Sequence, residues 1–171
     1  MAKQKIEFES FLEAAGSEHA GFITEIHDTM LVNECTYVIK EAKSGYVLSY
    51  IHQPSQRTVA NYVFRKKGPM IRIYGDYVED YAEILQEWPE PMKQSIIKAG
   101  VCKRLLDPDA CSPKCLMGFR FVLDGQEMKK CRNNCFMFFL SEDTNPHLQQ
   151  MVANELQHRK QAAEIVMVTS R

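Results

Sequence analysis

Two Cys-x-x-x-Cys pairs stand at the ends of one short stretch, CSPKCLMGFRFVLDGQEMKKCRNNCFMFF, which covers residues 111–139. Between the pairs, Asp124-Gly125 separates two segments of alternating apolar and polar residues, 119–123 and 126–130. Asp-Gly favours the tight two-residue turns that close β-hairpins. The sequence therefore predicts a hairpin that carries both cysteine pairs toward its open end.

The turn also sets the register of this hairpin, because the number of turn residues determines which positions face each other. Apolar residues at alternate positions of the first segment then share one face, which we expect to pack inward. The predicted pairs are Leu123 with Gln126, Phe121 with Met128, and Phe119 with Lys130.

Five of the six cysteines lie between Cys102 and Cys135. In a reducing compartment such a cluster points to a metal or to reactive thiols, because stable disulfides are rare there. Zinc is the metal that thiolates bind most often in structural sites, with Zn–S bonds of about 2.3 Å. We expect a structural zinc held by Cys111, Cys115, Cys131 and Cys135, with Cys102 as a possible substitute for one of them.

The spacing within each pair limits this hypothesis. Four residues of extended strand span about 13 Å, so Cys131 and Cys135 can share one ion only if residues 132–134 form a turn. Ser112-Pro113 suits a turn between Cys111 and Cys115 in the same way. Zinc ribbons, however, use Cys-x-x-Cys pairs. Unligated buried thiols and a thiol redox protein that forms a disulfide therefore stay open as alternatives.

Two amphipathic helices are predicted at the start of the chain. Phe8, Phe11, Leu12 and Ala15 recur at helical spacing, and a second apolar run follows the break at Gly16-Ser17. His27 falls on the apolar face of that second run, which favours a hydrogen-bonded core histidine over a ligand. Isolated Cys35 is expected to be a small buried core residue.

Two consecutive hairpins follow. Residues 36–52 are rich in β-branched residues and tyrosine on either side of Lys43-Ser44-Gly45, and residues 59–75 repeat this arrangement around Lys67-Gly68-Pro69. Asp76 is then predicted to be the N-cap of a helix over 77–88, followed by a short helix to Gly100.

The last predicted element is a helix. Asn145-Pro146 is expected to supply its N-cap and first residue, and the helix is expected to end near Gln161, which leaves the apolar run at 165–168 unassigned.

The resulting order is two helices, an antiparallel meander of two hairpins, further helices, a cysteine-rich hairpin and a terminal helix. This order indicates an α+β fold, since it lacks the strand and helix alternation of nucleotide-binding folds. The composition of the chain changes near Val101. We expect an α+β part over 1–100 and a cysteine-rich part over 101–171, packed as one globule.

The charge balance excludes a global electrostatic attraction to nucleic acid or anionic membranes. The 171 residues include 21 basic and 22 acidic side chains. The first twelve residues alternate charged and apolar side chains, so we expect neither a signal peptide nor a membrane anchor, and a cytoplasmic location. The expected partner is a macromolecule or a small ligand.

Local nucleic-acid binding is an alternative. Arg120, Lys129, Lys130 and Arg132 lie among phenylalanines of the cysteine-rich hairpin, a combination that could supply phosphate contacts and stacking. Inward packing of the aromatic side chains is the competing and favoured interpretation.

Catalysis has weaker support in the sequence. The five histidines stand apart, and none belongs to a recognisable acid-base or metal-binding motif. Tyrosines of the meander could line a pocket, although tyrosines in strands usually pack. Whether the protein is an enzyme is therefore left open, and a non-enzymatic role is favoured.

The passage GYVLSYIHQPSQRTVANYVFRKKGPMIRIYG resembles the hairpin core of small uncharacterised bacterial proteins of the YdhG-like group. CKRLLDPDACSPKC together with KKCRNNCFMF is similar to a cysteine-rich extension in uncharacterised proteins of gut Firmicutes. The resemblance covers about half of the chain. It implies an α+β fold and a bacterial cytosolic origin, but no activity and no catalytic residue.

Overall fold

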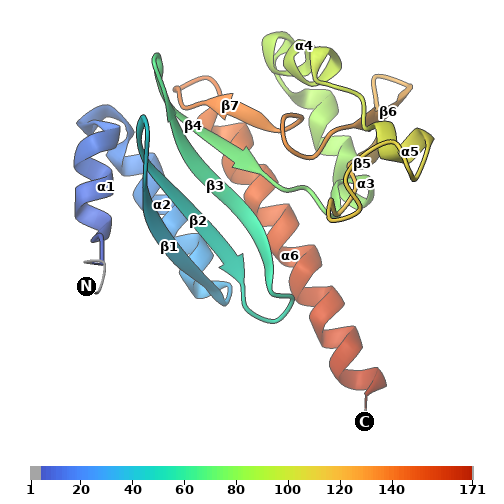
Figure 1. Cartoon of the computed structure of the whole chain (residues 1–171), viewed down its shortest axis with the longest axis horizontal. Helices are drawn as coiled ribbons and strands as arrows, with labels where there is room; N and C mark the ends of the chain where they lie inside the picture. Colours follow the sequence, from blue (N-terminus) through green and yellow to red (C-terminus); the bar gives the residue numbers. More distant parts are fainter. Residues whose placement is uncertain (1–4, 171) are drawn as a thin grey trace.

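The structure is a computed structural model that describes residues 5–170. It contains an antiparallel sheet with helices on one face and a separate two-stranded hairpin beside it (Figure 1). In chain order the elements are α1 (Phe8–Ala15), α2 (Ser17–Val32), β1 (Cys35–Ala42), β2 (Gly45–His52), β3 (Arg57–Arg65), β4 (Gly68–Ile73), α3 (Val78–Tyr81), the 3-10 helix η1 (Ala82–Glu87), α4 (Glu90–Lys98), α5 (Lys103–Leu106), β5 (Phe119–Leu123), β6 (Gln126–Lys130), β7 (Met137–Phe139) and α6 (Asn145–Thr169).

The predicted α+β fold class is confirmed. Helices α1 and α2 meet at Gly16, whose φ of +99° suits glycine and few other residues. The apolar stripe of each helix faces the core, with Phe11, Ile23 and Ile26 fully buried. Both helices therefore stabilise the fold by packing rather than by capping, because neither has a side-chain cap at its N-terminus.

The five-stranded sheet has the order β1-β2-β3-β4-β7. One of its faces carries Tyr50, Tyr62 and Ile71, all fully buried, and α2 and α6 lie along one side of the sheet (Figure 1). A bulge shifts the register between β2 and β3, where Tyr50 faces Ala60 but Ile51 faces Thr58. Both predicted hairpins of the meander are present.

The fifth strand was not predicted from the sequence. Strand β7 pairs with β4 through Met70 with Phe139 and Ile71 with Phe138. Its partner lies more than sixty positions earlier in the chain, so local periodicity gives no sign of it. This strand joins the cysteine-rich part of the chain to the main sheet, and buried residues of both parts belong to one core cluster.

The predicted register of the cysteine-rich hairpin is confirmed. Strands β5 and β6 pair Leu123 with Gln126, Phe121 with Met128 and Phe119 with Lys130. The predicted turns are also present, since the amide of Cys135 donates to the carbonyl oxygen of Cys131 at 3.1 Å and that of Cys115 to Ser112 at 3.1 Å.

Three helix boundaries differ from prediction. Tyr77, not Asp76, occupies the N-cap position of α3, because the Asp76 carboxylate is engaged by arginines instead. The region predicted as one helix over 77–88 is a short α-helix followed by a 3-10 helix. Helix α6 runs to Thr169, well past Gln161, and includes the apolar run at 165–168. Within residues 5–170, every helix is too short or too polar to cross a lipid bilayer.

Candidate functional site

The cysteines of the C-terminal part differ in accessibility. Cys111 is exposed, Cys115 and Cys131 are half-buried, and Cys102 and Cys135 are buried. All of them are free thiols. Three of the five are thus open to solvent or to a metal.

Cys135 is a core residue. Its side chain is fully buried in the same cluster as neighbouring Phe136. Burial raises the pKa of the Cys135 thiol, and nearby Lys130 acts in the opposite direction. The Cys102 sulfur contacts the Gly118 amide at the end of the loop that carries Cys111 and Cys115, whereas the Cys135 side chain is enclosed in the core. Cys102 therefore takes the place of Cys135 in the ligand set proposed below, a substitution that the sequence left open.

Cys102 lies against the start of the cysteine-rich hairpin. Its sulfur accepts a hydrogen bond from the Gly118 amide at 3.2 Å, and its own amide donates to the Lys129 carbonyl oxygen at 2.9 Å. A Cβ atom at position 118 would lie 2.9 Å from the Cys102 sulfur and would clash with the Lys130 carbonyl oxygen. Glycine at 118 is therefore required for this approach.

Cys131 is fixed by its neighbours. Its amide donates to the Gly100 carbonyl oxygen at 2.8 Å. On one side, Lys130 is only 7 % exposed and its ammonium donates to the carbonyl oxygens of Ile97 at 2.6 Å and Ala99 at 2.9 Å. Lys130 thus caps the C-terminus of α4. On the other side, Arg132 is 8 % exposed and reaches into an ion-pair cluster.

Cys111 and Cys115 lie on a segment with no core of its own. No residue from Lys103 to Gly118 is buried. Side chains from outside the 107–118 loop reach it at two carbonyl oxygens, where Arg104 donates to Cys115 and Arg132 donates to Met117 at 3.1 Å. Both contacts fall near Cys115, whereas Cys111 is exposed.

The candidate thiols share a neighbourhood but not a coordination sphere. In the part of the chain that the structure describes, no three Cys, His, Asp or Glu side chains are placed to hold a metal ion. The Cys102 sulfur nevertheless contacts the Gly118 amide, Cys115 lies three residues before Gly118 in the chain, and Cys131 directly follows Lys130, which pairs with Phe119. Zinc coordination would therefore require residues 111–115 to move, whereas the end of the loop is held at Met117 by Arg132.

An ion-pair cluster centred on Asp76 lies beside this region. Asp76 Oδ1 is 3.2 Å from Arg132 Nη2, and its Oδ2 is 3.2 Å from Arg159 Nη2 and 3.3 Å from Arg57 Nε. Arg159 in turn lies 2.9 Å from Glu155 on α6. The Asp76 cluster, defined as these five residues, thus connects the cysteine-rich turn, the β3 and β4 ends and the last helix.

Glu155 is held by three donors. Tyr81 donates from its hydroxyl to Oε2 at 2.6 Å, Arg159 donates to Oε1, and the Tyr77 amide lies 3.3 Å from Oε2. Burial raises the pKa of Glu155, while Arg159 and Tyr81 oppose that shift. Because the Asp76 and Glu155 carboxylates are both occupied by protein donors, the cluster is suited to fixing elements together rather than to acid-base chemistry.

The basic residues proposed for nucleic-acid contact are largely engaged. Lys130 caps α4 and Arg132 binds Asp76, so neither presents its charge to solvent. Arg120 is exposed but lies 3.6 Å from Glu127. Phe119, Phe121 and Phe136 pack on one another inside the core, with ring centroids 5.5 Å apart in each pair that includes Phe136. These three rings are thus packed inward.

Two tyrosines of the meander fill the core. Tyr50 and Tyr62 are fully buried, and the Tyr50 hydroxyl lies 3.0 Å from His27 Nδ1. Phe8 stacks on His27 with ring centroids 3.8 Å apart. The predicted core role of His27 is confirmed, and the buried face of the sheet is occupied by helices rather than open to a ligand.

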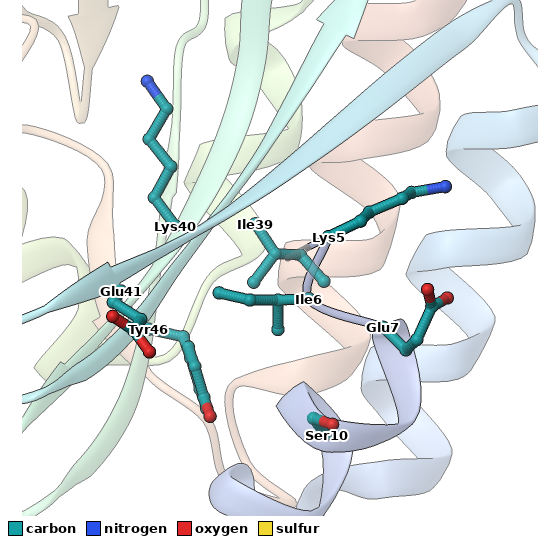
Figure 2. A pocket seen from close by; sticks show the side chains of 8 residues that line it. All are labelled: Lys5, Ile6, Glu7, Ser10, Ile39, Lys40, Glu41 and Tyr46. Atoms are coloured by element: carbon teal, nitrogen blue, oxygen red, sulfur yellow. The ribbon is translucent and has the colours of Figure 1, made fainter. Parts of the chain in front are cut away.

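A cleft of about 680 Å³ lies between the start of the chain and the hairpin of β1 and β2 (Figure 2). Ile6 and Ile39 approach each other there, and Tyr46 extends along the same space, while the Lys5 and Lys40 side chains point away from it (Figure 2). Side chains of both charges stand around the cleft, so its electrostatics favour no one class of ligand. It is far in the sequence from the cysteine-rich segment, and Tyr46 is the one residue of its lining that belongs to the meander tyrosines suggested for a pocket.

No known protein family, curated protein or solved structure matches this chain.

Proposed function

We propose that this protein is a non-enzymatic binding domain whose cysteine-rich segment is held by one structural zinc ion. The proposed ligands are the thiolates of Cys102, Cys111, Cys115 and Cys131. The clamped segment would support a surface that binds another macromolecule or a small ligand. The resemblance to YdhG-like proteins supports a bacterial cytoplasmic protein as part of this proposal.

One observation carries the zinc proposal: the stretch from Lys103 to Gly118 buries none of its residues. A segment of this length without a core needs another source of stability, and small proteins use disulfides or metals for it. After α5, residues 107–118 form a loop without helix or strand, and its length is near the limit above which such loops are uncommon in compact domains. A metal site that includes Cys111 and Cys115 would supply the missing constraint.

The surrounding contacts bring three of the four proposed ligands toward one place. Cys102 and Cys131 are attached to neighbouring backbone segments, with amide hydrogen bonds of 2.9 and 2.8 Å. Cys115 lies three residues before Gly118, whose amide contacts the Cys102 sulfur. Thiolates in a zinc site lie under about 4 Å apart. The exposed loop is the part of the site free to close that gap, and binding would order it.

The alternative is a thiol redox protein. It is favoured by the accessibility of Cys111, Cys115 and Cys131 as free thiols. Reactive thiols need to be accessible and to form thiolate, whereas metal-bound thiolates resist alkylation until the metal is removed.

Alkylation of native protein separates the two proposals. Protein purified without chelators is treated with a thiol reagent before and after addition of a zinc chelator, and the modified cysteines are mapped by mass spectrometry. Zinc binding predicts protection of Cys111, Cys115 and Cys131 that is lost with chelator. Immediate labelling, together with disulfide formation under mild oxidant, would replace zinc by the redox alternative. Cys35 is a built-in control, because it is buried and its labelling should not respond to the chelator.

A further inference from the structure

Arg132 connects the two backbone segments that carry proposed ligands. It directly follows Cys131, and its Nη1 donates to the carbonyl oxygen of Met117, two residues after Cys115, at 3.1 Å. Its guanidinium carbon lies 4.9 Å from the centre of the Tyr74 ring and 5.5 Å from that of Phe119. The guanidinium thus lies against two aromatic rings, and its position fixes the Cys131 and Met117 segments relative to each other.

The same guanidinium also binds the Asp76 cluster. Nη2 of Arg132 lies 3.2 Å from Asp76 Oδ1, and the other oxygen of this carboxylate contacts Arg159 of α6 at 3.2 Å. Arg159 is itself fixed to the sheet, since it donates to the carbonyl oxygens of Arg57 at 3.2 Å and Tyr74 at 3.0 Å. A continuous chain of ion pairs therefore runs from the cysteine-rich segment to the last helix.

We infer that Arg132 is a positioning residue for the metal site and that, through Asp76 and Arg159, it couples metal binding to the docking of α6. This inference rests on the proposed zinc function. Coupling between two sites is reciprocal, so a metal that fixes Cys131 and Cys115 stabilises the contact of α6 with the sheet, and docked α6 increases metal affinity. Partners that orient metal ligands without touching the metal commonly change affinity 10- to 100-fold when removed.

Arg132→Lys is the sharpest variant for testing this role. Lysine keeps the positive charge, but its single ammonium lacks the planar fork that lets Arg132 donate to the Met117 carbonyl oxygen from one nitrogen and form an ion pair with Asp76 through another. Zinc affinity is measured by competition with a chromophoric chelator on zinc-stripped, reduced full-length protein. We expect affinity to fall about 10-fold or more in Arg132→Lys. The matched control, Arg120→Lys, alters an exposed arginine on the same hairpin that forms an ion pair with Glu127, and should bind zinc as the unaltered protein does.

Hydrogen exchange tests the coupling in the unaltered protein first. Zinc added to the stripped, unaltered protein should slow amide exchange in α6 around residues 148–159 as well as near the cysteines. In Arg132→Lys the protection should remain near the cysteines and be lost in α6. A zinc effect confined to the cysteine-rich segment of the unaltered protein would overturn the coupling even if Arg132→Lys failed to fold.

The two proposals fail in different ways. Equal zinc affinity in Arg132→Lys and Arg120→Lys, with clear binding in the unaltered protein, would overturn the positioning role and leave the zinc site intact. Absence of zinc binding in the unaltered protein would overturn both.

Discussion

Arg159 Nε lies 2.9 Å from Glu155 Oε1, one turn earlier on α6, and both side chains are almost wholly buried. Removing one member of a buried ion pair leaves an uncompensated charge, which costs about 3–5 kcal/mol. Arg159→Met should therefore lower the free energy of unfolding by about that amount, measured by urea denaturation. Exposed Arg120→Met is the matched control and should change it by less than about 0.5 kcal/mol. Equal effects of the two substitutions would contradict a stabilising role for the Asp76 cluster.

Lys130 should matter for stability more than its position in a basic run suggests. Its ammonium donates to the carbonyl oxygens of Ile97 and Ala99 at the end of α4. Hydrogen bonds from a charged group contribute about 1.5–3 kcal/mol each, and here the helix end would lose its cap. Lys130→Met, which loses both hydrogen bonds, is expected to destabilise the protein by at least about 3 kcal/mol in thermal or urea unfolding. Lys129→Met, next to it in the chain, should be close to neutral, and a reversed order of the two would refute the capping role.

Two glycine substitutions should change the stability of the protein in opposite directions. Gly118→Ala places a methyl group 2.9 Å from the Cys102 sulfur and against the Lys130 carbonyl oxygen, so β5 must shift. We expect a loss of at least about 1–3 kcal/mol, typical of overpacking. Gly21→Ala, in α2, meets no atom within 4 Å and should stabilise the protein by about 0.5–1 kcal/mol through helix propensity. Melting temperatures of the two variants decide the point, and a stabilising Gly118→Ala would show that the close approach to Cys102 is absent.

His27 should make the stability depend on pH. Burial lowers the pKa of His27 below its ordinary value of 6.5, with Asp28 and Glu9 acting in the opposite direction. The unfolded chain therefore binds a proton before the folded protein does. Stability from His27 is fully present above about pH 6.5 and is lost as the pH falls from there toward the lowered pKa of the folded state.

His27→Phe is the variant that tests this pH dependence. Phenylalanine keeps a ring for stacking on Phe8 but cannot be protonated. The free energy of unfolding should decline less steeply between about pH 6.5 and 5 in this variant than in the unaltered protein, measured by urea unfolding across that range. Identical slopes in the two proteins would exclude His27 as a source of the pH dependence. Burial also lowers the pKa of His52, so part of the pH dependence should remain in His27→Phe.

Local patterns in the sequence predict most of the fold. The Asp124-Gly125 turn gave the register of β5 and β6, because a tight turn leaves one pairing available. The apolar stripes of α1 and α2 and the core position of His27 were likewise predictable from helical spacing. Strand β7 was not, because its hydrogen bonds are to β4, far away in the chain, and three residues are too few for a periodic signal.

The candidate site was predictable only in part. Cysteine clustering and the two turns were evident, but the burial of Cys135 depends on packing against the core, which spacing does not reveal. The role of Asp76 shows the same limit. Its position before an apolar run suggests an N-cap, yet three arginines from distant parts of the chain engage its carboxylate instead. Such ion pairs have no local signature.

Zinc stoichiometry tests the central claim most directly. The chain is purified without chelators or a polyhistidine tag, and its metal content is measured by elemental analysis alongside Cys102→Ser, Cys111→Ser, Cys115→Ser and Cys131→Ser. The account predicts about one zinc per chain, as expected for a single four-thiolate site, lost or strongly reduced in each of these variants and retained in Cys35→Ser. A freshly reduced protein that contains no zinc and takes up none when it is supplied would contradict the account.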